Sequence, residues 1–427
     1  MMFHRFTALL LSSGFVVSTA CAQSADKIIN APAAEKIIRV LAADEMKGRK
    51  VFTPEIDKAA DYIAAQFKEA GLQPGSGNSY LQSFSMVSPK QESLTATIDG
   101  QTFDAKKVLV LTSTADLTVT DKSGYEQRTI AAGDELFEGV MGAATAEKNL
   151  IVWVDESFAN TFPRLSFLKR TLFKSDKSVI FVLGKKANSF SFAAKHSIEE
   201  KKLANVVGIL PGKKHKDQYV IFSGHYDHIG ISTREAINGD SIFNGANDDA
   251  AGITAVILLA RYYKALGNND RTIIFAAFTA EEVGGYGSQY FSKQFHPDKV
   301  MAMFNIEMIG TESKWGRNSA YITGYEKSDM GKILQSNLTG TGFTFHPDPY
   351  PDQQLFYRSD NATLARLGVP AHTISTAKME DEPNYHKVTD HVETLDMENM
   401  AKIINSIALS ARSIVSGKDT PSRVKEK

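Results

Sequence analysis

The alternation of apolar strands with helices after residue 203 is the feature that most constrains the fold of this chain. Four apolar runs in this region are rich in Val, Ile and Phe, which is typical of strands buried on both faces. The segments between them carry apolar residues at helical spacing. This pattern predicts an α/β fold, with a mainly parallel mixed sheet flanked by helices on both faces. The expected strands are Val206–Leu210, Tyr219–Ser223, Thr272–Phe278 and Met301–Ile306, and the expected helices are Gly252–Leu266, Gly287–Gln294 and Ser328–Leu338.

The rest of the chain is expected to form four further parts. Residues 1–22 combine an arginine, a short apolar stretch and a small-residue site, which predicts an export signal peptide. Residues 23–93 carry two expected helices and form one domain together with residues 200–416. Residues 94–199 hold short β-like runs between polar turns and predict an inserted β-rich lobe. Residues 417–427 are polar and are expected to form a flexible tail.

Composition and charge exclude several classes of protein. The chain has 427 residues, of which 48 are basic and 49 acidic, so its formal net charge is −1. This balance argues against a nucleic-acid partner, because such binders carry a basic excess or stripe. No segment is long and apolar enough to span a bilayer. The predicted signal peptide, without a later spanning segment, predicts that the protein is exported, as a periplasmic or secreted protein.

The single cysteine, Cys21, limits the chemistry further. One cysteine cannot form an intrachain disulfide or a thiolate metal cluster, so any bound metal needs nitrogen and oxygen ligands. Cys21 lies at the predicted cleavage site, and a lipoprotein anchored through it is the alternative to a cleaved signal peptide.

Two pairs of polar residues lie where expected strands and helices meet, one of histidine with aspartate and one of two aspartates. His225 and Asp227 follow a strand and share one face of an extended chain. A carboxylate beside an imidazole is the usual outer partner of a metal-bound histidine. Asp248 and Asp249 lie among small residues before a helix. One aspartate suffices for an N-terminal cap, which leaves the other free to face a cavity.

Three more groups of polar residues follow the same pattern. Glu281 and Glu282 end an apolar strand, and burying both without a cation costs several kcal/mol. Glu307 lies between Ile and Met just after the next strand, and His386 precedes Asp390 by four residues. Each group alone also fits a solvated turn, a buried paired glutamate or a surface histidine. Together they place imidazoles and carboxylates at the carboxyl ends of strands, where ligands bind in open α/β sheets. Such a set suits zinc, and five ligands with one bridging carboxylate suffice for two ions.

These motifs resemble those of a known family. The chain is similar to the zinc-dependent exopeptidases that include secreted bacterial aminopeptidases, glutamate carboxypeptidase II and the non-catalytic transferrin receptor. The resemblance covers about residues 203–415 and implies a phosphorylase/hydrolase-like zinc peptidase fold. The central insertion resembles the protease-associated domain of some members. The matching motifs are, in order, SGHYDHIG, NGANDDAAG, AFTAEEVGGYGS, FNIEMIG and YHKVTD.

The resemblance implies a role for each motif residue. Glu281 matches the general base, which takes a proton from the attacking water and passes it to the leaving amine. The family typically has a cis peptide bond after the bridging aspartate, here the Asp248–Asp249 bond. The implied ligands are His225 and Glu307 for the first zinc, Glu282 and His386 for the second and Asp248 for both, with Asp227, Asp249 and Asp390 as outer partners.

Several positions leave alternatives open. Many relatives have Asp at the position of Glu307, so metal affinity is expected to differ there and occupancy by a single metal stays an alternative. Tyr357 and Arg358 fall in a loop that lines the substrate pocket in relatives. Both are candidates for substrate contacts, and both also fit a rim aromatic and a surface arginine. Four further residues are expected to support the site or the fold: His228, Asp240, His372 and His391.

The function that the resemblance implies is an exopeptidase with two Zn²⁺ ions per subunit, and an aminopeptidase acting on peptides in particular. A dipeptidase or carboxypeptidase of the same family is the first alternative, because end-group specificity lies in pocket loops. A glutaminyl cyclase on the same scaffold is the second. A non-catalytic binding domain is the third, although its signature, loss of metal ligands, is missing from these motifs.

Overall fold

The structure is a computed structural model, and it describes residues 25–425. The predicted signal peptide, including Cys21, lies outside the described residues and stays a prediction. The chain divides into two compact units. Of the described residues, the first unit comprises 25–83 and 203–425, and the second comprises Phe84–Lys202. Among residues 25–425, no helix has the length and apolar character that crossing a membrane requires.

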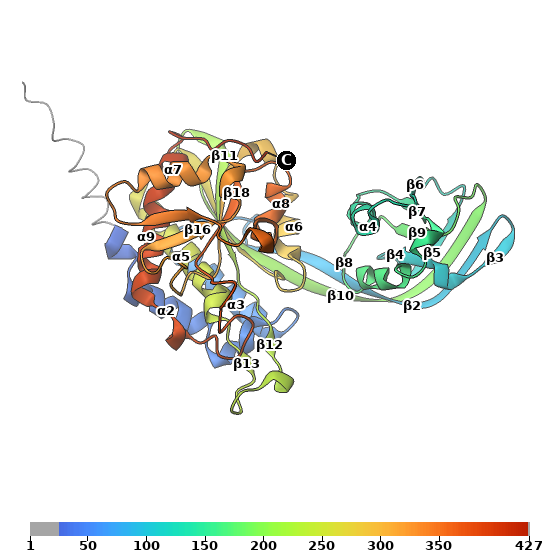
Figure 1. The fold of residues 1–427 in the computed structure, drawn as a ribbon, viewed down its shortest axis with the longest axis horizontal. Coiled ribbons are helices and arrows are strands. Elements are labelled where there is room, and N and C mark those ends of the chain that lie inside the picture. The colour runs from blue at the N-terminus through green and yellow to red at the C-terminus, as the bar shows by residue number, and fades with distance from the viewer. Residues whose placement is uncertain (1–24, 426–427) are drawn as a thin grey trace, which may run out of the picture. The chain divides into compact units, whose positions relative to one another are not determined.

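A mixed sheet forms the centre of the first unit (Figure 1). Its strands are, in spatial order, β17 (Thr344–Pro347), β16 (Ser319–Ile322), β18 (Ala371–Ser375), β15 (Val300–Ile306), β11 (His215–His225), β14 (Arg271–Phe278) and β10 (Phe190–Leu210). The four neighbours β18, β15, β11 and β14 run parallel. Strands β10 and β16 join this group in antiparallel pairs. The sheet is thus mixed with a parallel centre, as the sequence predicts.

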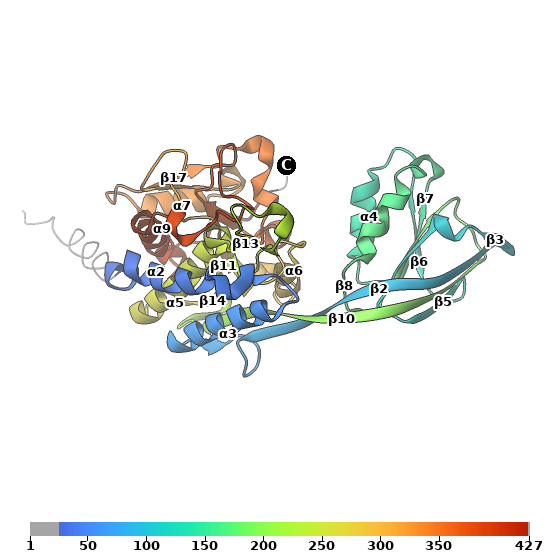
Figure 2. The same cartoon turned by 90° about the horizontal axis from the view of Figure 1, so that it is seen from below.

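Helices cover both faces of this sheet. Successive residues of a strand point to opposite faces, and both faces carry buried apolar side chains. In β11, Val220 and Phe222 join one apolar cluster, whereas Ile221 joins another on the opposite face. Figure 2 shows several of these helices from below. The helices of the first cluster are α2 (Ala31–Leu41), α3 (Pro54–Glu69), α5 (Ala251–Leu266), α7 (Met330–Asn337), α9 (Met397–Ser410) and α10 (Arg412–Val415), and those of the second are α6 (Tyr286–Ser292) and α8 (Ala362–Ala365).

The ends of these helices follow from local sequence. Helix α2 begins after Asn30, whose side chain accepts a hydrogen bond from the backbone N–H of Ala33 at 3.0 Å. Asp396 caps α9 in the same way. Helix α5 ends at Gly267, which adopts a left-handed conformation with φ of 58°. The observed bounds of α5, α6 and α7 agree with the expected bounds within a few residues.

The end of the chain differs from the expectation of a flexible tail. The guanidinium of Arg271 donates a hydrogen bond to the carbonyl of Asp419 at 2.7 Å. Arg423 donates to the carbonyl of Val300 at 2.9 Å, and Val424 is buried in the second apolar cluster. Residues 417–425 are thus held against the first unit by backbone contacts, which the polar composition of the segment does not indicate.

The second unit is rich in β-strands. Its four-stranded sheet has the order β4 (Val108–Leu111), β9 (Val179–Leu183), β7 (Leu150–Val154) and β6 (Glu126–Ile130). Helix α4 (Leu136–Ala144) packs on one apolar cluster of this sheet, and Trp153 lies in the other. The chain enters and leaves the unit through the long strands β2 (Leu81–Ile98) and β10. The second unit begins at Phe84, whereas the sequence predicts its beginning at residue 94. Strand β2 continues across this border without a break, so the sequence shows no boundary there.

Candidate metal centre

Three strand ends carry the first group of site residues. His225 is the last residue of β11, Glu281 and Glu282 follow β14 by three and four positions, and Glu307 follows β15 directly. These strands run parallel and pair with one another through β11, so their carboxyl ends lie at one edge of the sheet. The topology therefore brings together residues that are up to 82 positions apart, at the edge where open α/β sheets bind ligands.

Asp248 reaches the same edge from a tight turn before α5. The turn spans Ala246–Ala250, and its Asp248–Asp249 peptide bond is cis, which confirms the bond that the family resemblance implies. Gly245 precedes the turn with φ of 58°. A Cβ atom at Gly245 would lie 2.3 Å from the carbonyl oxygen of Asp248 and 2.6 Å from the ring of His228. Only glycine therefore allows this turn to pack so closely on the site.

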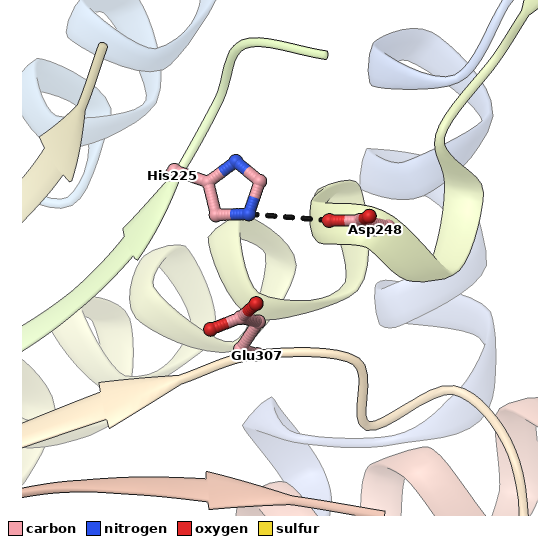
Figure 3. Close-up of side chains that lie close together, drawn as sticks. All are labelled: His225, Asp248 and Glu307. Atoms are coloured by element: carbon pink, nitrogen blue, oxygen red, sulfur yellow. Dashed lines mark ion pairs between the residues drawn. The ribbon is translucent and has the colours of Figure 1, made fainter. Parts of the chain in front are cut away.

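The two carboxylate oxygens of Asp248 face two different histidines. His225 Nε2 lies 3.2 Å from Asp248 Oδ1 (Figure 3). His386 Nε2 lies 3.2 Å from Asp248 Oδ2 and 3.2 Å from Glu282 Oε2. Glu307 completes a group with His225 and Asp248 in which one ligand atom of each residue lies within 4.8 Å of the others. A second such group consists of His228, Asp248 and Glu282. The predicted ligand His386 approaches the same two carboxylates, so Asp248 lies between two sets of potential metal ligands.

The spacing of these atoms fits zinc. Ligand atoms at the corners of a tetrahedron with bonds of about 2.0–2.1 Å to a central zinc are about 3.3 Å apart. The three separations of 3.2 Å match this value. Furthermore, His225 Nε2 and Asp248 Oδ2 are buried and have no hydrogen-bond partner among the described residues. Buried polar atoms are almost always partnered, so these two atoms are available to a metal.

The electrostatics of the metal-free site also favour cations. Burial raises the pKa of Glu281 well above its usual range, and the nearby carboxylates of Glu307 and Asp360 raise it further. Burial lowers the pKa of His386, but its contacts with Asp248 and Glu282 outweigh this effect and raise the pKa to about 10. Metals bind the deprotonated imidazole, so metal binding displaces a proton and the metal affinity is expected to fall as the pH falls.

Asp227 supports the site differently from the sequence expectation. His225 Nδ1 lies 3.1 Å from the backbone carbonyl of Asp227, whereas the Asp227 carboxylate is 3.9 Å away. That carboxylate instead accepts hydrogen bonds from the backbone N–H groups of Glu281 at 3.0 Å and Glu282 at 3.3 Å. Asp227 therefore fixes both the imidazole of His225 and the backbone of the glutamate pair.

Asp249 and Asp390 hold neighbouring loops through the backbone as well. The Asp249 carboxylate accepts hydrogen bonds from the N–H groups of His225 at 3.2 Å and Met308 at 3.1 Å. The Asp390 carboxylate accepts from Asn247 at 2.8 Å and Asp248 at 3.0 Å, rather than from the histidine four residues before it. Each outer carboxylate thus ties together segments that carry metal-ligand candidates.

Comparison with known proteins decides the family. Residues 205–411 match the family model described as Peptidase family M28. Residues 205–411 of the chain therefore belong to peptidase family M28. Aminopeptidase YwaD of Bacillus subtilis is 23% identical to this M28 chain over 425 residues, which cover 92% of the chain and 82% of YwaD. A probable leucine aminopeptidase of Trichophyton verrucosum is 26% identical over 206 residues, which cover 46% of the chain and 53% of the relative.

A solved structure supports the same fold. The structure of an aminopeptidase from Aneurinibacillus sp. strain AM-1 matches the M28 chain with a TM-score of 0.54 and 19% identity, covering 95% of this chain and 97% of the other. These findings confirm the α/β fold class and the family resemblance. The chain spans 22% to 53% of the length of several other curated relatives that it matches.

A cavity of about 70 Å³ opens beside the metal-ligand candidates of the M28 chain. Asp248, Glu281 and Glu307 line it on one side, and Arg358 and Tyr385 line it elsewhere. Tyr385 also stacks on the imidazole of His386, with ring centroids 3.9 Å apart. Of the two substrate-contact candidates, Arg358 thus lies at the cavity, whereas Tyr357 does not belong to its lining. The Tyr357 ring packs on Phe356, with the guanidinium of Arg366 5.2 Å from its centroid.

Sequence patterns missed a buried arginine that holds the M28 site together. The side chain of Arg49 is fully buried. It donates hydrogen bonds to four backbone carbonyls, those of Leu41, Tyr226, Asn244 and Gly245. Tyr226 follows the ligand candidate His225, and Gly245 directly precedes the turn of Asp248. None of the five motifs of the sequence analysis includes Arg49, so the sequence did not indicate this role.

We expect Arg49→Met to lower the free energy of unfolding by about 2–5 kcal/mol, because four buried carbonyls lose their donor. Urea unfolding of the metal-free protein measures this change. Arg39→Met is the matched control, since Arg39 is half exposed and pairs only with the surface carboxylates of Glu35 and Glu393. Exposed pairs contribute about 0–1 kcal/mol, so equal losses in the two variants would contradict the role given to Arg49.

Proposed function

We propose that this protein is a metal-dependent aminopeptidase that holds two zinc ions and removes N-terminal residues from peptides. The observation that carries the proposal is the position of Asp248 between two ligand groups, with Oδ1 and Oδ2 each 3.2 Å from a different histidine. A carboxylate that bridges two ions requires this arrangement. Membership in a peptidase family and the names of the aminopeptidase relatives support the same function.

The ions would supply a polarised carbonyl and an activated water at neutral pH. His225 and Glu307 would hold one ion, Glu282 and His386 would hold the other, and Asp248 would bind both. Glu281 lies at the cavity wall and is not needed as a ligand. Its carboxylate accepts the proton of the attacking water and returns it to the leaving amine.

The lining of the cavity favours a free amino terminus. Three carboxylates, those of Asp248, Glu281 and Glu307, line the cavity. The carboxylate of Glu281, which is not assigned to a metal, can accept a hydrogen bond from the α-amine of a peptide, and a bound ion would offer that amine a second contact. The apolar residues Leu355 and Met379 line the same cavity and favour an apolar side chain on the terminal residue.

Peptides with free or blocked ends test this proposal. We expect hydrolysis of aminoacyl-nitroanilides and of peptides with a free N-terminus, and no hydrolysis when the N-terminus is acetylated. A chelator should abolish the activity, and zinc should restore it. Cleavage of N-acetylated peptides from their C-terminus would indicate a carboxypeptidase, hydrolysis of dipeptides alone would indicate a dipeptidase, and ammonia release from glutaminyl peptides without cleavage would indicate a cyclase. Any of these three results would contradict the proposal.

A further inference from the structure

His228 lies against the second ligand group, although the family resemblance gives it no role. Its Nδ1 atom is 2.7 Å from Glu282 Oε1, and its side chain is fully buried. We propose that His228 is a positioning residue, which donates a hydrogen bond to Glu282 Oε1 and thereby holds Oε2 in the orientation that binds the second metal. This inference rests on the two-metal site of the proposed function and concerns how that site reaches its affinity.

The distances between side-chain atoms distinguish a hydrogen bond from the spacing of two atoms that bind the same metal. The three ligand pairs of the site have separations of 3.2 Å, as expected around zinc. The separation of 2.7 Å between His228 and Glu282 is shorter and lies in the range of charge-assisted hydrogen bonds. His228 contacts Oε1 of Glu282, whereas Oε2 faces His386. Oε1 of Glu282 therefore accepts a hydrogen bond, and Oε2 is available to the metal.

The position of His228 relative to Asp248 agrees with this assignment. His228 Nδ1 is 3.9 Å from Asp248 Oδ2, whereas His386 Nε2 is 3.2 Å from the same oxygen. Four ligand atoms around one zinc should be almost equally spaced. His386 satisfies that spacing with both Asp248 and Glu282. His228 forms a group within 4.8 Å with the same two carboxylates, but its separations of 3.9 Å and 2.7 Å are unequal.

The fold holds the imidazole of His228 rigidly. The backbone N–H of His228 donates to the carbonyl of Arg49 at 3.3 Å, so the same buried arginine segment fixes its main chain. Gly245 leaves space for the ring, since a Cβ atom there would lie 2.6 Å from it. The ring of His386 lies across that of His228, with centroids 5.8 Å apart and an angle of 67°. An imidazole confined in this way can hold the carboxylate of Glu282 in one orientation.

The inference is tested by measuring the affinity of each metal site separately. Zinc content at buffered free-zinc concentrations gives the two affinities, and Co²⁺ absorption reports the geometry of each site. We expect His228→Leu to weaken the second metal by about 10–100-fold and to leave the first unchanged, because loss of an outer partner has this effect. His228→Asn places an amide N–H near the position of Nδ1 and should restore most of the affinity. His296→Leu is the matched control, because His296 is exposed and far from this motif in sequence.

Three results would overturn the inference. His228→Leu with unchanged affinities would show that the hydrogen bond has no effect on the metal. His228→Asn as weak as His228→Leu, with both proteins folded by circular dichroism, would show that a hydrogen-bond donor at this position is not what sustains the affinity. A wild-type protein that binds one metal would remove the second site altogether. If His228→Leu does not fold, His228→Ala repeats the test without added bulk. Peptide hydrolysis by the wild-type protein tests the proposed function separately from these affinities.

Discussion

Glu281→Gln is expected to lower kcat by about 10²–10⁴-fold while the protein keeps both metals. Glutamine has the shape of glutamate but cannot accept the proton of the attacking water. The backbone N–H of Glu281 donates to the carboxylate of Asp227 at 3.0 Å, and this bond does not depend on the side chain. The substitution should therefore leave the loop and the neighbouring ligand Glu282 in place.

Steady-state hydrolysis of an aminoacyl-nitroanilide, together with elemental analysis of the same sample, measures this effect. KM should change little, because Glu281 is assigned a task in the reaction and none in metal binding. Activity within tenfold of the wild-type protein would show that another group takes the proton. A loss of activity that parallels a loss of metal would instead make Glu281 a ligand.

Asp248→Ala is expected to remove both metals and with them all activity. Each oxygen of Asp248 faces a different ligand group, so one substitution removes a ligand from both sites. The affinity loss should exceed the ~10–100-fold that loss of an outer partner costs. No other single substitution in the site is expected to weaken both metals to this extent.

Zinc content at buffered free-zinc concentrations measures the affinity of both sites in Asp248→Ala. His386→Ala is the matched comparison, because it removes a ligand of the second site alone and should leave one zinc bound. Melting temperatures measured in chelator separate a loss of metal from a loss of fold. If Asp248→Ala retained one zinc at wild-type affinity, Asp248 would belong to a single site and the bridging role would be wrong.

Much of the fold and the membership of the site could be predicted from the sequence for one physical reason. Parallel strands buried on both faces give apolar runs, and their carboxyl ends meet at one edge of the sheet. The polar residues that directly follow such runs are therefore neighbours in space, as His225 and Glu307 are. Asp248 follows no strand of this sheet, and its place in the site depended on the motif that resembles the family.

The support around the ligands could not be predicted, because it depends on how distant loops meet. Asp227 and Asp390 stand near histidines in the sequence, yet their carboxylates bind backbone N–H groups of other segments. Arg49 donates to carbonyls up to 196 positions away. A pattern of residue types carries no information on such side-chain-to-backbone contacts. The same limit applies to residues 417–425, which bind the sheet through carbonyls although their composition is that of a solvated tail.

The central claim, that two metals share Asp248, is tested most directly by anomalous diffraction at the zinc edge from crystals of the zinc-loaded protein. Two peaks are expected about 3.5–4 Å apart. One should lie beside His225 and Glu307, the other beside Glu282 and His386, with one oxygen of Asp248 next to each. A single peak in crystals grown at saturating zinc, or peaks away from Asp248, would contradict the account.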